Sequence, residues 1–164
     1  LATAAPSEIK RHVNNAILKH RAHFKSEPLF FAYPYGEYSK VLKSFIQQSG
    51  FRAALGLQSG VAYMGTDPFI LPRFTMNGTY GDLERFHRVA NALPLPIFDP
   101  IPEDSFIDNS TSIGFSVPSS LEKDLGDLNC FISGNQKPDL EIIGTRVELR
   151  GIDMLEEERT RINC

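Results

Sequence analysis

Histidines are the first residues in this sequence whose side chains could bind a metal ion. His12, His20 and His23 fall within one predicted helix, and the last two are three residues apart on nearly one face. That spacing could hold zinc if a third ligand came from elsewhere. No acidic residue or cysteine stands at ligand spacing, and Lys and Arg are frequent nearby. The pattern therefore favours a solvated helix face, and we predict no metal site in this chain.

Two cysteines are the next candidates for chemistry. Cys130 and Cys164 each follow an apolar residue and an asparagine in predicted strands, so alternation points both toward a β core. They could form a disulfide in an exported protein or remain buried thiols in the cytosol. A count of two does not decide between these alternatives. No His or Lys stands nearby in the sequence to activate either thiol, so we expect no reactive cysteine.

Two short apolar runs are each followed by a loop that contains aromatic or polar residues, at 33–37 and at 58–60. Runs of β-forming residues bounded by Pro and Gly predict buried strands. Between the runs, Ser39 is placed to begin an amphipathic helix and Gly50 to end it. Strand, helix and strand predict a parallel pair with a right-handed connection. Ligands bind at the carboxyl ends of parallel strands, so these two loops are the predicted site.

The rest of the chain predicts two more helices and a β-rich tail. Apolar residues at helical spacing mark one helix from about Ser7 to Phe24 and another over 83–93. Four prolines exclude a helix or a central strand at 94–102. We therefore predict a linker at 94–104 between domains at 1–93 and 105–164. In the second domain apolar residues alternate, which predicts a small antiparallel β unit of four or five strands.

Composition and charge exclude several classes of protein. The 164 residues suffice for one sizeable core, or for a medium domain plus a small one. A net charge of −3 gives no basic field overall, so we expect no nucleic-acid partner. No segment approaches the ~18 uninterrupted apolar residues of a membrane helix. The chain begins at Leu1 without Met or a signal peptide, which we interpret as a processed product, an engineered piece or a proteolytic fragment.

Three separated motifs in this chain resemble the later part of a polysaccharide deacetylase. They are Ala32-Tyr33-Pro34-Tyr35-Gly36-Glu37-Tyr38, Ala54-Leu55-Gly56-Leu57-Gln58-Ser59-Gly60 and Leu71-Pro72-Arg73-Phe74. They occur in the order found in the chitooligosaccharide-deacetylase-like carbohydrate esterases, and the likeness covers residues 28–75. It implies an α/β fold in which this chain holds the last β/α units of a distorted (β/α) barrel, followed by the small antiparallel β unit.

The resemblance implies metal-dependent hydrolysis of N-acetyl groups on polymers of N-acetylhexosamine. Such chemistry uses a divalent, zinc-like metal to polarise the acetamide carbonyl and activate water, with a carboxylate as base. The family's Asp-Asp and His-x-x-x-His motifs are both absent from this sequence. We therefore expect the parent protein to bind the metal and this chain to be inactive alone. We expect the parent protein in the periplasm or outside the cell, which favours an oxidised pair of cysteines.

By resemblance, the remaining site residues form one wall of a substrate groove. The backbone N–H of Tyr35 would help to hold the oxyanion, which contributes on the order of 3 kcal/mol. The commonest family pattern has an Arg before the Pro-Tyr pair, near Ala32 here, so Arg73 is the candidate cation that orients the base. Without the resemblance, these tyrosines are ordinary strand-end aromatics and Arg73 is a surface ion-pair partner. The predicted substrate-binding residues are Tyr33, Pro34, Gly36, Gln58 and Arg73.

Two further interpretations remain open. The chain could be a non-catalytic glycan- or protein-binding module, whose β-rich tail would present exposed aromatics such as Phe106, Phe115 or Phe131. Alternatively, it could be a fragment with no function of its own. Such a fragment would have unpaired strand edges and uncovered apolar faces, which favour a homo-oligomer.

Overall fold

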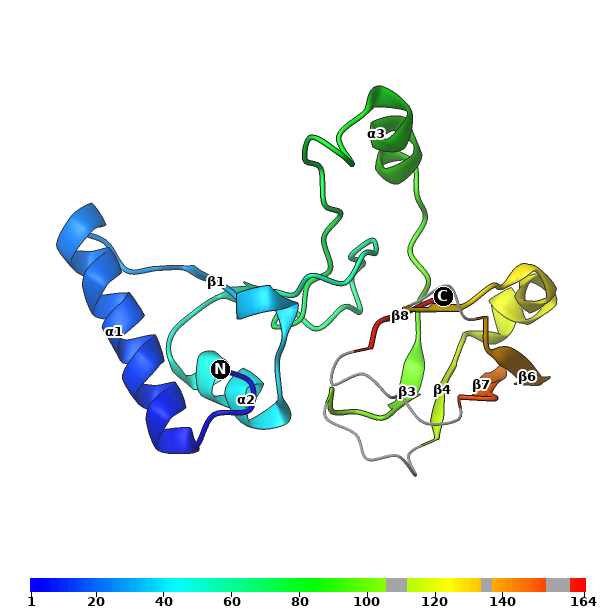
Figure 1. The fold of residues 1–164 in the computed structure, drawn as a ribbon, viewed down its shortest axis with the longest axis horizontal. Coiled ribbons are helices and arrows are strands. Elements are labelled where there is room, and N and C mark those ends of the chain that lie inside the picture. The colour runs from blue at the N-terminus through cyan, green and yellow to red at the C-terminus, as the bar shows by residue number, and fades with distance from the viewer. Residues whose placement is uncertain (106–111, 134–136, 153–159) are drawn as a thin grey trace. The chain divides into compact units, whose positions relative to one another are not determined.

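The computed structural model describes the chain except for residues 106–111, 134–136 and 153–159. The chain divides into two compact units, Leu1–Pro94 and Leu95–Cys164, which we call unit 1 and unit 2 (Figure 1). Each unit has its own cluster of buried apolar side chains. In the part of the chain that the structure describes, no helix is both long enough and apolar enough to cross a bilayer.

Helix α1 (Pro6–Phe24) follows the apolar stripe that its sequence predicts. Ile9 and Val13 are each only 1% exposed, so the stripe lies in the core of unit 1. The helix begins one residue before the predicted Ser7, with a proline in its first turn, where the missing N–H has no intrahelical partner to lose. It ends where Lys25 adopts a left-handed conformation and its N–H donates to the Arg21 carbonyl.

Strand β1 (Phe30–Ala32), helix α2 (Lys40–Gln48) and strand β2 (Ala53–Leu55) form the predicted strand–helix–strand unit (Figure 1). The predicted cap is confirmed, because Ser39 Oγ accepts the Leu42 N–H at 3.2 Å. Strands β1 and β2 pair in parallel, as predicted. Gly50 has φ +86 just beyond the helix, in the region that favours glycine.

The core of unit 1 lies on one face of this parallel pair. Leu42 and Ile46 of α2 are fully buried and form one apolar cluster with Ile9 and Val13 of α1. Burying each of these side chains contributes about 1.5–3 kcal/mol. Phe30 of β1 is 63% exposed. Parallel sheets in proteins usually have both faces covered, so the face that carries Phe30 differs from that pattern.

A third segment of unit 1 lies beside β2. Leu55 and Leu71 form a parallel bridge, the Leu71 N–H donates to the Ala54 carbonyl at 2.9 Å, and the Gly56 N–H donates to the Leu71 carbonyl at 2.9 Å. The order across the unit is therefore β1, β2 and the segment around Leu71. The residues described in unit 1 do not close a barrel, and the partial barrel stays a prediction.

Helix α3 (Leu83–Ala90) is shorter than the predicted 83–93. Asp82 caps its start, with Oδ1 accepting the Arg85 N–H at 2.8 Å. At its end the Asn91 side chain donates to the His87 carbonyl at 2.7 Å. Leu93 lies beyond the helix because the proline that follows it disfavours helical backbone. None of the residues of α3 is buried.

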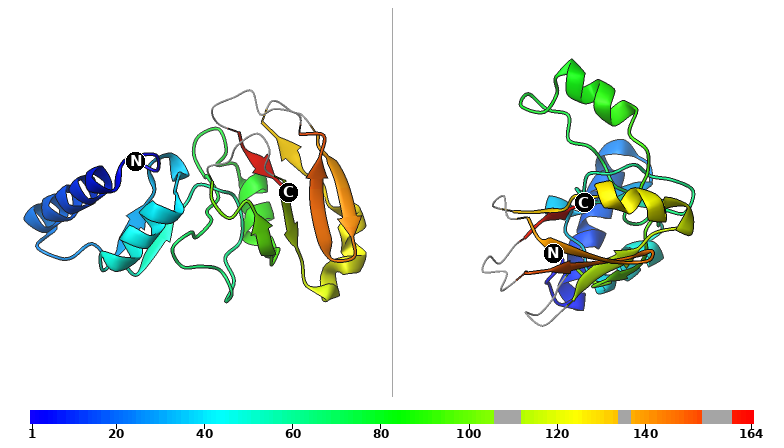
Figure 2. Two further views of the ribbon diagram at one scale, coloured as in Figure 1. Left: turned by 90° about the horizontal axis from the view of Figure 1, so that it is seen from below. Right: turned by 90° about the vertical axis from the view of Figure 1, so that its right-hand side faces the viewer.

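Unit 2 contains the antiparallel sheet that the alternating pattern predicts. Its strand order is β3-β4-β7-β6, and every pairing is antiparallel (Figure 2). A separate antiparallel pair is formed by β5 and β8. The bounds are β3 (Phe98–Ile101), β4 (Ile113–Ser116), β5 (Phe131–Ile132), β6 (Asp139–Ile143), β7 (Arg146–Arg150) and β8 (Ile162–Asn163).

Strand β3 lies inside the segment 94–104 that the sequence analysis predicts to be a linker. That prediction is wrong for residues 98–101, because they pair with β4 at the edge of the sheet. Pro100 lies within the strand, and an edge position is where a residue without an N–H is tolerated. The register shifts between Phe98 and Ile101, and Asp99 within this shift has φ 46. The shift is typical of a bulge.

A disulfide and a short 3-10 segment complete unit 2. Cys130 is fully buried in the core with Val147 and Leu149, and it is bonded to Cys164 across a sequence separation of 34. Of the two alternatives for the cysteines, the structure contains the disulfide. The prediction that both cysteines face the β core is wrong for Cys164, which is exposed, because it lies just beyond the two paired residues of β8. The 3-10 segment η2 (Ser119–Asp127) supplies the buried Leu125 to the same core. This segment was not predicted from the sequence.

Candidate functional site

The three motif segments of unit 1 meet at the carboxyl ends of β1 and β2. A side chain on Gly36, after β1, would have its first carbon 2.6 Å from the backbone nitrogen of Leu57, after β2. Gly36 also has φ +76, a backbone conformation that favours glycine. The close approach and the backbone conformation therefore each favour glycine at this position. The Gln58 carbonyl accepts the Arg73 N–H at 3.0 Å. Residues that the sequence singles out from separate motifs are therefore neighbours at one edge of the sheet.

The turn after β1 is tight and presents one ring to the surface. The Gly36 N–H donates to the Tyr33 carbonyl at 2.9 Å, closing a short 3-10 turn, η1 (Pro34–Gly36). Tyr35 lies in the left-handed region with φ 58, which is uncommon for a residue other than glycine. Its side chain is 77% exposed. The structure thus places the predicted catalytic residue at a surface turn, and the role of its N–H stays a prediction.

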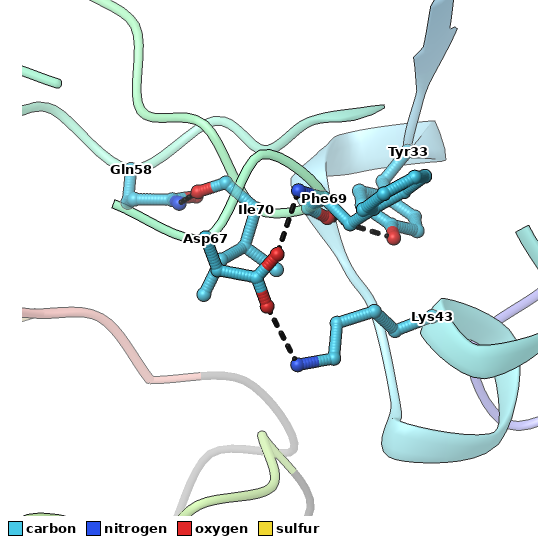
Figure 3. Close-up of polar contacts among 6 residues, drawn as sticks. All are labelled: Tyr33, Lys43, Gln58, Asp67, Phe69 and Ile70. Carbon is cyan, nitrogen blue, oxygen red and sulfur yellow. Dashed lines mark hydrogen bonds and ion pairs between the residues drawn. The ribbon is translucent and has the colours of Figure 1, made fainter. Parts of the chain in front are cut away.

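Tyr33 is placed differently from the predicted groove-lining residue. It is only 1% exposed, and its hydroxyl donates to the Phe69 carbonyl at 2.9 Å (Figure 3). Its ring contacts those of Phe31 and Tyr38, with centroids 5.3 Å and 5.4 Å away. Burial raises the pKa of the Tyr33 phenol well above its ordinary value, and the nearby Asp67 charge raises it further. In this chain Tyr33 is a buried residue that holds the Phe69 segment next to the site.

Asp67 and Lys43 hold the segment that Tyr33 contacts. Asp67 Oδ1 accepts the Phe69 N–H at 2.8 Å, and Asp67 Oδ2 accepts a hydrogen bond from Lys43 Nζ of α2 at 2.9 Å (Figure 3). Their side chains are 31% and 28% exposed, so the ion pair alone contributes about 0–1 kcal/mol. Neither residue was predicted from the sequence to belong to the site. The Asp67-Pro68 dipeptide was the available signal, because Asp before Pro favours a turn.

Gln58 also contacts this segment. Its side-chain Nε2 donates to the Ile70 carbonyl at 2.8 Å (Figure 3). The amide folds over Gly56, where any side chain would collide with it. Gln58 is nevertheless exposed, so the residue links two loops while part of it stays reachable from solvent.

Arg73 has an unusual environment among these residues. Its Nε is buried without a hydrogen-bond partner, while the residue as a whole is intermediate in exposure. The described residues supply no ion pair or hydrogen bond to its side chain. The alternative interpretation of Arg73 as a surface ion-pair partner is therefore not what the described part of the chain contains.

Two of the three histidines of α1 contact the backbone, and His12 contacts the Arg11 side chain. His20 Nδ1 is 3.0 Å from the Ser26 carbonyl oxygen, and His23 Nδ1 is 3.0 Å from the Lys19 carbonyl oxygen. Across the described ranges, no three His, Cys, Asp or Glu side chains are grouped as a metal would require. The residues that are described do not fit the divalent metal that the resemblance implies, and we derive no step through it from this chain.

The aromatics proposed for a binding face of unit 2 do not share one environment. Phe115 is 8% exposed and packs in the core, whereas Phe131 is 54% exposed. Phe106 lies outside the described residues. The prediction that Phe115 is an exposed binding aromatic is wrong, because its alternation in β4 points it inward. Phe131 is therefore exposed and Phe115 is not, and Phe98 of β3 is a further exposed aromatic of unit 2, at 50%.

Charge is divided unequally between the two units. Unit 1 carries 11 Lys and Arg against 6 Asp and Glu, whereas unit 2 carries 6 against 14. The net charge of −3 for the whole chain therefore conceals a basic unit and an acidic one. The expectation of no basic field holds for the sum and not for unit 1.

Comparison of the chain with protein-family models found no match, and comparisons with curated proteins and with solved structures found none either.

Proposed function

We propose that unit 1 is the substrate-facing part of a polysaccharide deacetylase whose catalytic metal ion is held outside this chain. The parent protein would hydrolyse N-acetyl groups on a polymer of N-acetylhexosamine. One observation supports the proposal above the others: the three motif segments meet at the carboxyl ends of two parallel strands, with Gly36 against Leu57 and Arg73 bonded to Gln58. Loops at this edge of a parallel sheet are where ligands bind.

The proposal gives the site residues distinct tasks. The exposed ring of Tyr35 and its neighbours Pro34 and Gly36 form the groove wall, and the Tyr35 N–H is directed at the oxyanion of the attacked acetamide. Gln58 and the buried Tyr33 hold the loops in place. In the parent, water adds to the acetamide carbonyl, the carbon–nitrogen bond breaks, acetate leaves and the amine takes the proton. A divalent metal ion bound by other residues of the parent would supply the activation of that water.

We place the parent protein in the periplasm or outside the cell. The disulfide between Cys130 and Cys164 supports an oxidising compartment. We also propose that unit 1 self-associates. Strand β1 pairs with β2 on one side, and Phe30 on the strand is 63% exposed. An edge of this kind is a template for pairing with another chain.

Binding and activity can be tested separately on this chain. We expect isothermal calorimetry to detect binding of a chitooligosaccharide to this chain. Tyr35→Ala should weaken this binding about tenfold, because an aromatic ring that becomes buried against the sugar contributes about 1.4 kcal/mol. Tyr80→Ala is the matched control, because Tyr80 is also exposed, at 52%, and lies outside the three motifs. With added zinc we expect no acetate. Acetate release by this chain would contradict the incomplete site, and binding unaffected by Tyr35→Ala would contradict the proposed groove.

A glycan-binding module is the second candidate, and the exposure of Phe131 on β5 is the observation that favours it. The same titration separates the two. Loss of oligosaccharide binding in Phe131→Ala with binding retained in Tyr35→Ala would assign the binding to unit 2. The reverse result would assign it to unit 1.

A further inference from the structure

We propose that Arg73 is an anion-binding residue and that the ligand of unit 1 is an acidic glycan carrying carboxylate groups. The glycan part of this inference rests on the proposed function, whereas the anion site rests on the structure of Arg73 alone. Planar carboxylates match the fork of a guanidinium and bind it through two parallel hydrogen bonds.

Four buried side-chain atoms in the described ranges have no hydrogen-bond partner: Arg73 Nε, Arg85 Nε, Asp104 Oδ1 and Arg146 Nη2. Arg73 differs from the other three residues in the contacts of the rest of its side chain. Arg85 lies over the ring of Tyr80, with 5.4 Å to its centroid. Arg146 donates to Glu148 at 2.6 Å and to the Asp99 carbonyl at 2.7 Å, and Asp104 takes part in another interaction. Arg73 is the member of this set whose side chain has no interaction with a described residue.

Within the described residues, the Nε donor of Arg73 is therefore buried without an acceptor. Arginine cannot lose its proton in a protein, so this charge cannot be removed by titration. Burying a charged donor without a partner is unfavourable, and the cost is removed when an acceptor binds. Arg73 as a residue is intermediate in exposure, so its side chain is not fully enclosed.

The position of Arg73 connects the anion site to the proposed groove. Its N–H is bonded to the Gln58 carbonyl at 3.0 Å, and a side chain on Gly60 would lie 3.3 Å from the ring of Pro72. The backbone at Arg73 is thus fixed at the edge where the Tyr35 turn lies. Unit 1 also carries five more basic than acidic residues, counting Lys and Arg against Asp and Glu, and this excess raises the local concentration of anions.

An acidic glycan fits this combination better than a general polyanion. A sugar ring can pack on an exposed aromatic such as Tyr35 while its carboxylate pairs with a single guanidinium. A polyanion attracted only by net charge would use the many exposed cations of α1, such as Arg11 and Lys19, and would depend little on Arg73.

The test compares a neutral oligomer of N-acetylglucosamine with a hyaluronan oligosaccharide of equal length, in which glucuronate alternates with N-acetylglucosamine. We expect the wild-type chain to bind the acidic oligomer at least tenfold more tightly. Arg73→Gln should abolish that preference and Arg73→Lys should restore part of it. Arg11→Gln removes an exposed cation of α1 and is the matched control, which should keep the preference.

A second measurement on the wild-type chain avoids dependence on the folding of the variants. Phenylglyoxal modifies accessible guanidinium groups, and mass spectrometry maps the modified residues. We expect the hyaluronan oligosaccharide to protect Arg73 and to leave Arg11 reactive. Equal protection of both residues, or of neither, would overturn the anion site.

The outcomes separate this inference from the proposed function. Equal binding of the two oligomers, with loss in Tyr35→Ala, would overturn the acidic preference and leave the deacetylase proposal standing. Binding of succinate that requires Arg73, with no binding of either oligomer, would support the anion site and contradict the glycan groove. Tighter binding of an oligothymidylate that Arg73→Gln abolishes would overturn the glycan. No binding of any probe would overturn both proposals.

Discussion

Units 1 and 2 position their loops by different means. In unit 1 the two parallel strands have three residues each, and side-chain bonds to the backbone hold the loops that follow them, from Tyr33 to Phe69 and from Gln58 to Ile70. In unit 2 a four-stranded antiparallel sheet and the disulfide from Cys130 hold the chain. The candidate ligand-binding loops of unit 1 are therefore held by single side-chain hydrogen bonds, whereas unit 2 also has a covalent cross-link.

Composition follows the same division. All five tyrosines lie in unit 1 and both cysteines lie in unit 2, and the chain has no tryptophan. Tyrosine fluorescence therefore reports on unit 1, and reduction acts on unit 2. These two probes allow each unit to be perturbed and observed separately.

The largest expected effect is removal of the disulfide in Cys130→Ala/Cys164→Ala. Closing a loop over a sequence separation of 34 stabilises unit 2 by about 4 kcal/mol in the chain-entropy account. We expect the amide of Ser133, which bonds to the Arg161 carbonyl at 2.9 Å, to lose hydrogen-exchange protection. The urea-unfolding transition followed by tyrosine fluorescence, which reports on unit 1, should not shift. A shift of the tyrosine transition by a similar free energy would show that the two units unfold together.

The matching test of unit 1 is Ile46→Ala in α2. Ile46 is fully buried, so the substitution should lower the free energy of unfolding of unit 1 by about 3 kcal/mol through lost burial and a cavity. Val41→Ala on the same helix is the control, because Val41 is 54% exposed and should cost less than about 0.5 kcal/mol. Urea titration followed by tyrosine fluorescence measures both. Equal effects from the two variants would contradict the one-sided core.

The stability of unit 1 should also decrease at alkaline pH, which is the next largest expected effect. The pKa of Tyr33 is raised in the folded state, so above its ordinary value of 10.0 the unfolded chain loses a proton that the folded chain keeps. Stability present below pH 10 is therefore lost as pH rises, by up to about 1.4 kcal/mol per pH unit. The urea midpoint of unit 1 should fall between about pH 10 and about pH 11. Tyr33→Phe should flatten this dependence, and an unchanged slope would assign it to another group.

An effect of similar size is expected at Asp67, and the smallest effect is expected at its partner Lys43. Asp67→Ala removes the acceptor of the Phe69 N–H and the partner of Lys43, and should cost unit 1 about 1–2 kcal/mol. Lys43→Met removes the ion pair alone and should cost about 0–1 kcal/mol, because both side chains are partly exposed. Urea titration of both variants compares these terms. A larger loss in Lys43→Met than in Asp67→Ala would show that the charge of Lys43, and not the backbone bond, holds the segment.

The sequence by itself determined the local elements and their faces. The period of Ile9 and Val13 predicts α1, Ser39 predicts the start of α2, and alternation predicts the inward position of Cys130. These features follow from local backbone geometry and from the free energy of burying an apolar face, and both leave a pattern in neighbouring residues. The parallel pairing of β1 and β2 also followed, since a helix between two short strands permits little else.

Only the tertiary structure decided what the polar side chains contact. The hydroxyl of Tyr33 finds a carbonyl 36 residues away, and Lys43 reaches Asp67 across 24 residues. The Nε of Arg73 lacks a hydrogen-bond partner among the described residues, and Pro100 lies in an edge strand. Such contacts depend on which surfaces meet through space, and no period in the sequence records them. For this reason the loops of the candidate site could be predicted, whereas the division between exposed Tyr35 and buried Tyr33 could not.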